Sequence, residues 1–486
     1  MVDGTTDITI QEQESIVVRY VDENLVPEEV FLGFFAQSNG TTGEALTAMI
    51  LDVLLRLGLP LDNLRGQTYD GASSMSGKYN GTQALIAMQQ PLAIYVHCLM
   101  HAGNLVAQEA MEASNIIQDA ASLTNDVAAT CSRSTKLTTI LRGLQAENHD
   151  RASIRPLCPT RVLVRGAALK TVLNQYDSLC EALDEYAEVS TGDPASKARG
   201  LLKQINSGDF VLGLMMALPA IELLETLNRA VQSRSFTLSG SVVAMEVTYR
   251  GLDGLRSDEA FYQVFQSCVA RCDELGIEEP KLPRVHNRPK RYEHGATGSH
   301  QWASAEEFFR AQYFKFLDSA MASLKRRYDQ PGIQTYIKLE NILLKPLTTV
   351  ADVEAVVQQY PKFDGNTLHI QLAMLKQMIG TSTEVTLQVV VSKLVGLDPV
   401  VRCLFPQVEQ LVRLLLTIPC SSAEAERSFS GLRRLKTYLR NSMSHVRLNH
   451  LAVLHVHQAM TDGIDLVAVA RDFIRKSDSR LTTFGQ

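Results

Sequence analysis

The first 113 residues alternate between short apolar runs and helical segments, and this order restricts the fold more than any other feature. The runs Ser15–Tyr20 and Val30–Phe35 are rich in β-branched and aromatic residues, which favours strands. Asp22, Asn24 and Pro27 lie between them and suit a hairpin loop. The elements expected next are the helix Gly43–Leu57, the strand Leu64–Tyr69, a turn at Asp70–Met75, the helix Tyr79–Met88, the strand Ala93–Val96 and the helix Gly103–Ala113.

Residues 1–7 resemble the end of a further strand, so three antiparallel strands are expected before the strand–helix units. This order is typical of an α/β fold with an RNase H-like mixed sheet. From about Asn115 to Leu397 the hydrophobic periodicity is helical, and no comparable series of strands interrupts it. The predicted domains are residues 1–114, the N-terminal part of this core; 115–397, a large all-α insertion; and 398–486, which completes the core and ends in a helical segment.

Composition and charge indicate a folded globular chain, because 45% of the residues are hydrophobic and 21% are charged. The formal net charge of −6 argues against a uniformly basic nucleic-acid-binding surface but allows a local basic patch. Three basic residues stand close together between Val285 and His300, namely Arg288, Lys290 and Arg291. An exposed loop accounts for this basic cluster, and the alternative is an arm that contacts DNA phosphates.

The eight cysteines are widely spaced and include no Cys-x-x-Cys pair, so no zinc site is expected. Scattered cysteines in a chain of this length indicate reduced thiols inside a cell. The sequence shows neither a signal peptide nor an evident membrane-spanning run, so no membrane partner is expected.

An acidic helix start lies near the C-terminus, in the segment Cys420–Gly431 (CSSAEAERSFSG). Ser421 stands three residues before Glu424, which is the spacing of a capping box. Glu426 lies about 200° round the helix from Glu424, so it does not share that capping role. A carboxylate in the first turn of a helix stays ionised near the positive end of the helix dipole. Glu426 therefore suits a metal ligand or, alternatively, a solvated surface position.

Two aspartates follow expected strands near the N-terminus. Asp3 stands at a strand end in VDGTTD, and Asp70 follows the strand Leu64–Tyr69 directly. Strand ends at one edge of a sheet can converge, and three carboxylates can hold two Mg²⁺ ions for phosphoryl transfer. For Asp70 the alternative is a hydrogen-bonded turn before a helix, given the Asp-Gly pair. Asp7 is expected to be a cap or turn residue.

Both ends of the chain resemble proteins derived from hAT-family transposases. The C-terminal resemblance rests on LLLTIPCSSAEAERSFSGLRRLKTYLRNSMS and RLNHLAVLHVH, which look like the hAT dimerisation region. The N-terminal resemblance covers residues 1–113, including RGQTYDGASSMSGKYNG, and is to a domain found in zinc finger MYM-type proteins. It implies that Asp3, Asp70 and Glu426 are catalytic Mg²⁺ ligands, and that the chain is a nuclear homodimer that acts on DNA.

The resemblance also assigns positions close to the acids. His97-Cys98-x-x-His101, followed by Asn104, matches the family pattern H-C-x-x-H-x-x-N. By spacing alone this is half a zinc site, which is weak evidence. His101 is therefore expected beside the acids or the DNA, as is Arg427, without binding the metal. A buried, hydrogen-bonded histidine at a helix start explains His101 equally well.

Departures from the family pattern favour an inactive or truncated protein. Family members carry a tryptophan after Thr-Arg that handles a flipped base, whereas Val162 follows Thr160-Arg161 here. An aliphatic side chain cannot stack on a base as an indole does. No N-terminal zinc-binding recognition domain is visible, and few residues precede Asp3. The chain is thus expected to be a transposase-derived protein without transposition activity, and the alternative is a non-catalytic dimerising regulator associated with DNA.

Overall fold

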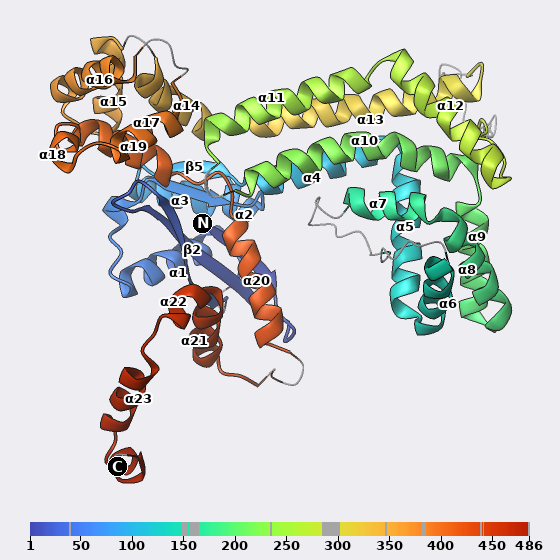
Figure 1. Cartoon of the computed structure of the whole chain (residues 1–486), viewed down its shortest axis with the longest axis horizontal. Coiled ribbons are helices and arrows are strands. Elements are labelled where there is room, and N and C mark those ends of the chain that lie inside the picture. Colours follow the sequence, from blue (N-terminus) through green and yellow to red (C-terminus); the bar gives the residue numbers. More distant parts are fainter. Residues whose placement is uncertain are drawn as a thin grey trace. The chain divides into compact units, whose positions relative to one another are not determined.

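The computed structural model describes most of the chain, in two compact units (Figure 1). The core unit is Met1–Cys98 with Thr335–Gln486, and the helical unit is Leu99–Gln334. The described residues are 1–37, 40–147, 154, 165–233, 236–283, 302–345, 348–380, 385–437, 440 and 442–484.

The core unit is built on two small sheets. The strands β1 (Val2–Thr6), β2 (Glu12–Val21) and β3 (Pro27–Ala36) form an antiparallel sheet in the order β1-β2-β3. The strands β4 (Gly66–Tyr69) and β5 (Ile94–His97) form a parallel pair, and β4 contacts β1. All five strands were predicted, with shifted ends. The fold is mixed α/β with a large helical part.

Short helices link the strands of the core unit. The predicted helix after Thr42 is confirmed as α1 (Gly43–Arg56). Thr42 caps it, because the Thr42 hydroxyl accepts from the Ala45 N–H at 3.3 Å. The predicted turn after Asp70 contains a short helix, α2 (Ser73–Ser76), which is followed by α3 (Thr82–Gln89). The core between these helices and the sheet is apolar, and its buried members are Val2, Ile16, Leu46, Ile50, Val53, Leu54, Tyr69, Met75 and Ile86.

Helices from the far end of the chain pack on the antiparallel sheet. They are α19 (Pro406–Thr417), α20 (Ala423–Leu435) and α21 (His445–Val456), and each contacts at least one strand of that sheet. The Ser15 and Ser428 hydroxyls are 2.8 Å apart. Asn449 bonds both the N–H and the C=O of Phe34, each at 2.7 Å. The C-terminal helices are thus fastened to the strands by buried polar contacts as well as apolar packing.

Asp7 is the turn residue that the sequence predicted. Its carboxylate accepts from the Thr9 N–H at 2.7 Å and forms an ion pair with Lys436 at 2.5 Å. The two side chains are 1% and 6% exposed, respectively. Burial alone would raise the pKa of Asp7, but the hydrogen bonds from Lys436 and Thr9 outweigh it and lower that pKa. The pair joins the β1–β2 turn to the end of α20.

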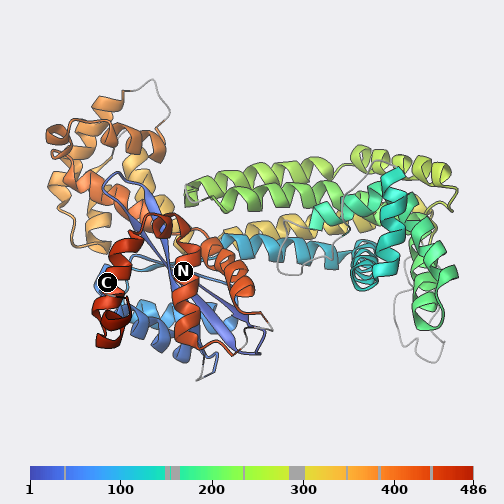
Figure 2. The same cartoon turned by 60° about the horizontal axis from the view of Figure 1, so that its bottom comes forward.

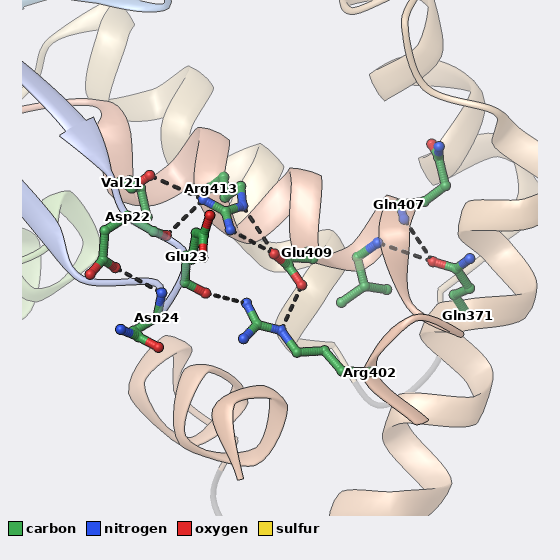
Figure 3. Close-up of polar contacts among 10 residues, drawn as sticks. Val21, Asp22, Glu23, Asn24, Gln371, Arg402, Gln407, Glu409 and Arg413 are labelled. Atoms are coloured by element: carbon green, nitrogen blue, oxygen red, sulfur yellow. Dashed lines mark hydrogen bonds and ion pairs between the residues drawn. The ribbon is translucent and has the colours of Figure 1, made fainter. Parts of the chain in front are cut away.

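A second polar network ties α19 to the β2–β3 turn (Figure 3). Arg413 donates to the carbonyls of Val21 and Asp22 at 3.0 and 2.7 Å, and Arg402 donates to the carbonyl of Glu23 at 2.7 Å. Both arginines also pair with Glu409. Figure 3 shows the three charged side chains converging on the turn from α19 and from α18 (Pro399–Arg402).

Further helices complete the core unit. Upstream of α18 lie α14 (Pro331–Leu344), α15 (Val350–Gln359), α16 (Gly365–Ile379) and α17 (Leu387–Val395), and downstream of α21 lie α22 (Gln458–Asp462), α23 (Leu466–Arg475) and α24 (Asp478–Phe484). By their contacts, the first residues of α14, Pro331 to Gln334, belong to the helical unit. The compact units therefore divide the chain differently from the domains predicted at 114 and 397, and those domain boundaries stay a prediction.

The helical unit contains ten helices among its described residues. They are α4 (Leu99–Ala113), α5 (Asn115–Arg133), α6 (Thr135–Glu147), α7 (Arg165–Asn174), α8 (Tyr176–Val189), α9 (Asp193–Ile205), α10 (Gly208–Val231), α11 (Leu238–Leu255), α12 (Asp258–Leu275) and α13 (Ala305–Tyr328). Figures 1 and 2 show α4, α10, α11 and α13 as long helices that lie side by side. The helical periodicity predicted for this part of the sequence is confirmed.

The helix α10 is the most apolar of the helical unit. Among the described residues it alone is long and apolar enough to cross a membrane by length and composition, and 67% of its apolar window is buried within the protein. It packs against α4, α5, α7, α11 and α12. Its burial indicates that α10 is apolar because it is a core helix of the helical unit.

Candidate functional site

Asp3 lies on β1 and shares a face of the sheet with Ser15. The two residues are paired across β1 and β2, and side chains at paired positions point to the same face. Because Ser15 contacts Ser428 of α20, this is the face that α20 covers. Asp3 also accepts from the Gly4 N–H at 3.1 Å.

Asp70 stands directly after β4, as predicted. Its carboxylate accepts from the Ala72 N–H at 3.2 Å, which is the hydrogen-bonded turn proposed as the alternative to a metal ligand. One carboxylate oxygen makes this bond, so the turn leaves the other oxygen able to bind elsewhere. The turn and a ligand role are therefore compatible.

Glu426 lies in the first turn of α20, but the predicted capping box is wrong. The residue before the helix is Ser422, with no side-chain cap, so the third helical position is Ala425 and not Glu424. Glu424 instead pairs with Arg427 at 2.6 Å, three residues further on. The helix begins one residue later than the sequence spacing indicated, so Glu424 stands at its second position.

Asp70 and Glu426 are close enough to Asp3 for their charges to act on it. The pKa of Asp3 is raised to about 8, first by burial and then by the negative charges of Glu426, Asp70 and Glu14. Like charges disfavour ionisation, so this shift reflects carboxylates gathered from β1, β2, α20 and the end of β4.

The fourth member, Glu14, was missed by the sequence interpretation. It lies on β2 opposite Gly4 and is 5% exposed, and its Oε2 atom has no hydrogen-bond partner among the described residues. A side chain at position 4 would begin 3.0 Å from both of its carboxylate oxygens, so glycine provides the room. Burial, followed by the charges of Asp70 and Glu12, raises the pKa of Glu14 to about 7.

A signal for Glu14 was present in the sequence. Gln13 and Glu14 are adjacent polar residues that lead into the apolar run Ile16–Val18. Successive side chains in a strand point to opposite faces of the sheet. When both faces are covered, two adjacent polar residues are therefore both buried. Both residues are in fact buried.

The oxygen donors of the cluster are of the kind that Mg²⁺ prefers. Asp3, Asp70 and Glu426 are the residues that would hold such an ion. Within the described part of the chain, however, no group of three or more His, Cys, Asp or Glu side chains is arranged to hold a metal ion. The donor chemistry fits Mg²⁺, whereas the side-chain arrangement does not.

The remaining predicted site residues fall in different places. Arg427 is on α20 with its side chain 46% exposed, paired with Glu424. His101 lies within the first turn of α4, because that helix begins at Leu99, earlier than predicted. It belongs to the helical unit, and its role stays a prediction. Val162 and the basic cluster Arg288, Lys290 and Arg291 lie outside the described residues.

Two parts of the chain match known families. Residues 1–81 match the family described as ZMYM1/FAM200, RNase-like domain. Residues 396–460 match the hAT family C-terminal dimerisation region. The resemblance to hAT-derived proteins that the two ends of the sequence indicated is confirmed.

Two curated relatives resemble nearly the whole chain. The chain is 22% identical over 99% of its length to the 52 kDa repressor of the inhibitor of the protein kinase of Homo sapiens. It is 20% identical over 96% of its length to the Mus musculus protein of the same name. The chain spans 64% and 62% of the lengths of these relatives, respectively.

Proposed function

We propose that this chain is a transposase-derived, dimerising protein that associates with DNA and does not catalyse transposition. The observation that supports it best is the acid cluster: the carboxyl of Asp3 lies near those of Glu426 and Asp70, as descent from a DNA strand-transfer enzyme requires. The cluster supports the ancestry. Two features of the chain speak against present catalysis.

The first feature is Val162, which stands where the family resemblance places a base-handling tryptophan. A valine side chain offers no aromatic face for a base to stack on. The second is Glu14, which adds a buried negative charge to the acids. Its negative charge raises the pKa of Asp3 further, so Glu14 disfavours the ionised form of Asp3.

The second candidate function is an active Mg²⁺-dependent transposase or nuclease with an RNase H-like Asp-Asp-Glu core. The retention of Asp3, Asp70 and Glu426 near one another favours it. For this candidate, Asp3, Asp70 and Glu426 would be the residues that hold Mg²⁺, and the ion would supply Lewis-acid chemistry for phosphoryl transfer. In the first candidate the same residues persist as a remnant of that chemistry.

Regulation in the nucleus is the biological role that fits the first candidate. The curated relatives are named as repressors. The match to a dimerisation region supports self-association through the C-terminal helices. We extend both properties to this chain as part of the proposal: a homodimer that contacts DNA and regulates without cutting.

A nicking assay separates the two candidates. The purified chain is incubated with Mg²⁺ or Mn²⁺ and with duplexes that carry inverted repeats from the DNA flanking its gene, beside an Asp70→Asn variant. We expect no end-specific nicking from either protein. End-specific nicking by the wild-type chain that Asp70→Asn abolishes would restore the enzyme, whereas nicking by both proteins comes from another nuclease.

A salt titration tests the DNA association. Weak binding that falls steeply with salt is expected, because phosphate contacts need only positive charge. Replacing the three residues of the basic cluster with alanine should lower the slope of log K against log salt by about 2–3, at about 0.9 per phosphate contact. The charge-matched control replaces three exposed cations of the helical unit, namely Arg133, Lys197 and Lys203. An equal decrease of this slope in both variants would contradict a role specific to the basic cluster.

A further inference from the structure

The helix α23 presents an apolar face to solvent. At about 100° per residue, Leu466, Val469 and Phe473 fall on one side of the helix, and Arg471 and Arg475 fall on the other. The three apolar side chains are 75%, 52% and 51% exposed, respectively. A helix of this kind in a folded protein normally buries such a face, and α23 lies beyond the matched dimerisation region, which ends at residue 460.

A groove of matching character lies on the core unit. It is formed by β3, α1 and the first half of α21, and has a volume of about 730 Å³. Its apolar lining includes Leu32, Phe35, Met49, Val53 and Val446. The lining runs along α1 from Ala45 to Arg56, about 16 Å at 1.5 Å per residue, and α23 is about 15 Å long by the same measure.

We propose that α23 of one copy of this chain docks in the α1–α21 groove of a second copy. The inference rests on the dimerisation proposed above and names the segment and the surface that make it. One wall of the groove, α21, lies within the hAT dimerisation match, so the groove continues the surface through which the family associates. Reciprocal docking gives a closed two-fold dimer in which each helix covers one groove.

The occupant is a second copy because of how α23 leaves its own core unit. The groove is lined by the N-terminal half of α21, at His445, Val446, Asn449 and His450. The chain continues into α22 and α23 from the opposite end of α21, and Figure 1 shows α23 beyond that end. The apolar face of α23 is exposed on its own chain, where a partner can receive it.

Light scattering on the full chain gives the first test. The wild-type chain should have twice its chain mass of 53.7 kDa, and the variant Leu466→Asp/Phe473→Asp should have the mass of one chain. The matched control, Arg471→Asp/Arg475→Asp, changes the polar face and should remain dimeric. A groove variant, Ala48→Trp, fills the receiving surface at an exposed position and should also be monomeric. Circular dichroism establishes that each variant is folded.

The outcomes separate this inference from the proposed function. A monomeric wild-type chain overturns both. A wild-type dimer that persists in both the α23 and the groove variants overturns the docking of α23 and leaves dimerisation through residues 396–460 intact. Loss of the dimer in the apolar-face and groove variants, with a dimeric polar-face control, supports the inference.

Cross-linking distinguishes docking between copies from docking within one chain. Cys403, an exposed thiol, is first replaced by serine. Ala48→Cys and Val469→Cys are then placed in separate, differently tagged chains, which are mixed and treated with a bismaleimide reagent. A cross-link that joins the two tags is expected. If the mixture shows none and a chain with both cysteines cross-links to itself, α23 folds back on its own groove and the inference is wrong.

Discussion

The buried carboxyl of Glu14 makes a prediction about stability against pH. Its pKa is raised from 4.5 to about 7, so the folded protein binds a proton there more tightly than the unfolded chain does. The stability that proton binding at Glu14 gives the folded protein is therefore fully present below pH 4.5 and is lost as the pH rises through about 7. Raising the pKa from 4.5 to about 7, at about 1.36 kcal/mol per unit, corresponds to about 3 kcal/mol of lost stability at higher pH.

The perturbation that isolates this effect is Glu14→Gln, which keeps the size of the side chain and cannot ionise. The free energy of unfolding of the variant, relative to the wild type, should rise by about 3 kcal/mol between pH 4.5 and pH 8. An unpaired amide would add an offset that is independent of pH, so the slope is the quantity to measure.

Urea unfolding followed by circular dichroism provides the assay. Fluorescence of Trp302 would report on the helical unit, whereas circular dichroism includes the core unit that contains Glu14. Glu354→Gln serves as the control, because it removes an exposed glutamate from α15 of the same unit. A difference between Glu14→Gln and the wild type that is flat with pH, or that falls as the pH rises, would refute the argument that this carboxyl is buried and repelled.

Two further predictions concern packing. Lys436→Met should destabilise the protein by about 3–5 kcal/mol at pH 7, because it leaves the carboxylate of Asp7 buried without its ion-pair partner; urea unfolding measures this, and a loss below 1 kcal/mol would contradict it. Gly103→Ala should destabilise the helical unit by about 1–3 kcal/mol, because the added carbon would lie 1.9 Å from the side-chain oxygen of Asn228. Gly200→Ala in α9, where the added carbon meets nothing within 4 Å, should instead be neutral or stabilising by up to about 1 kcal/mol. Thermal unfolding of the two alanine variants decides the comparison, and equal melting temperatures would contradict it.

Local sequence patterns determined most of the secondary structure. The β-branched runs became β2 and β3, and Thr42 caps α1 as expected. These features depend on residues a few positions apart, whose preferences act before distant parts of the chain meet. The same reasoning failed at Ser421, because the first residue of α20 depends on how the preceding chain packs and not on spacing alone.

The composition of the acid cluster depended on tertiary structure. Asp3, Asp70 and Glu426 could be named from motifs and resemblance, but the effect of Glu426 on the pKa of Asp3 arises only when α20 packs on the sheet that carries Asp3. The register of β1 and β2 pairs Glu14 with Gly4, on the sheet face opposite that of Asp3, and Glu14 acts on Asp3 through its charge. Register and helix packing are fixed by contacts between distant segments, so the sequence determined which acids were available and the fold decided which of them meet.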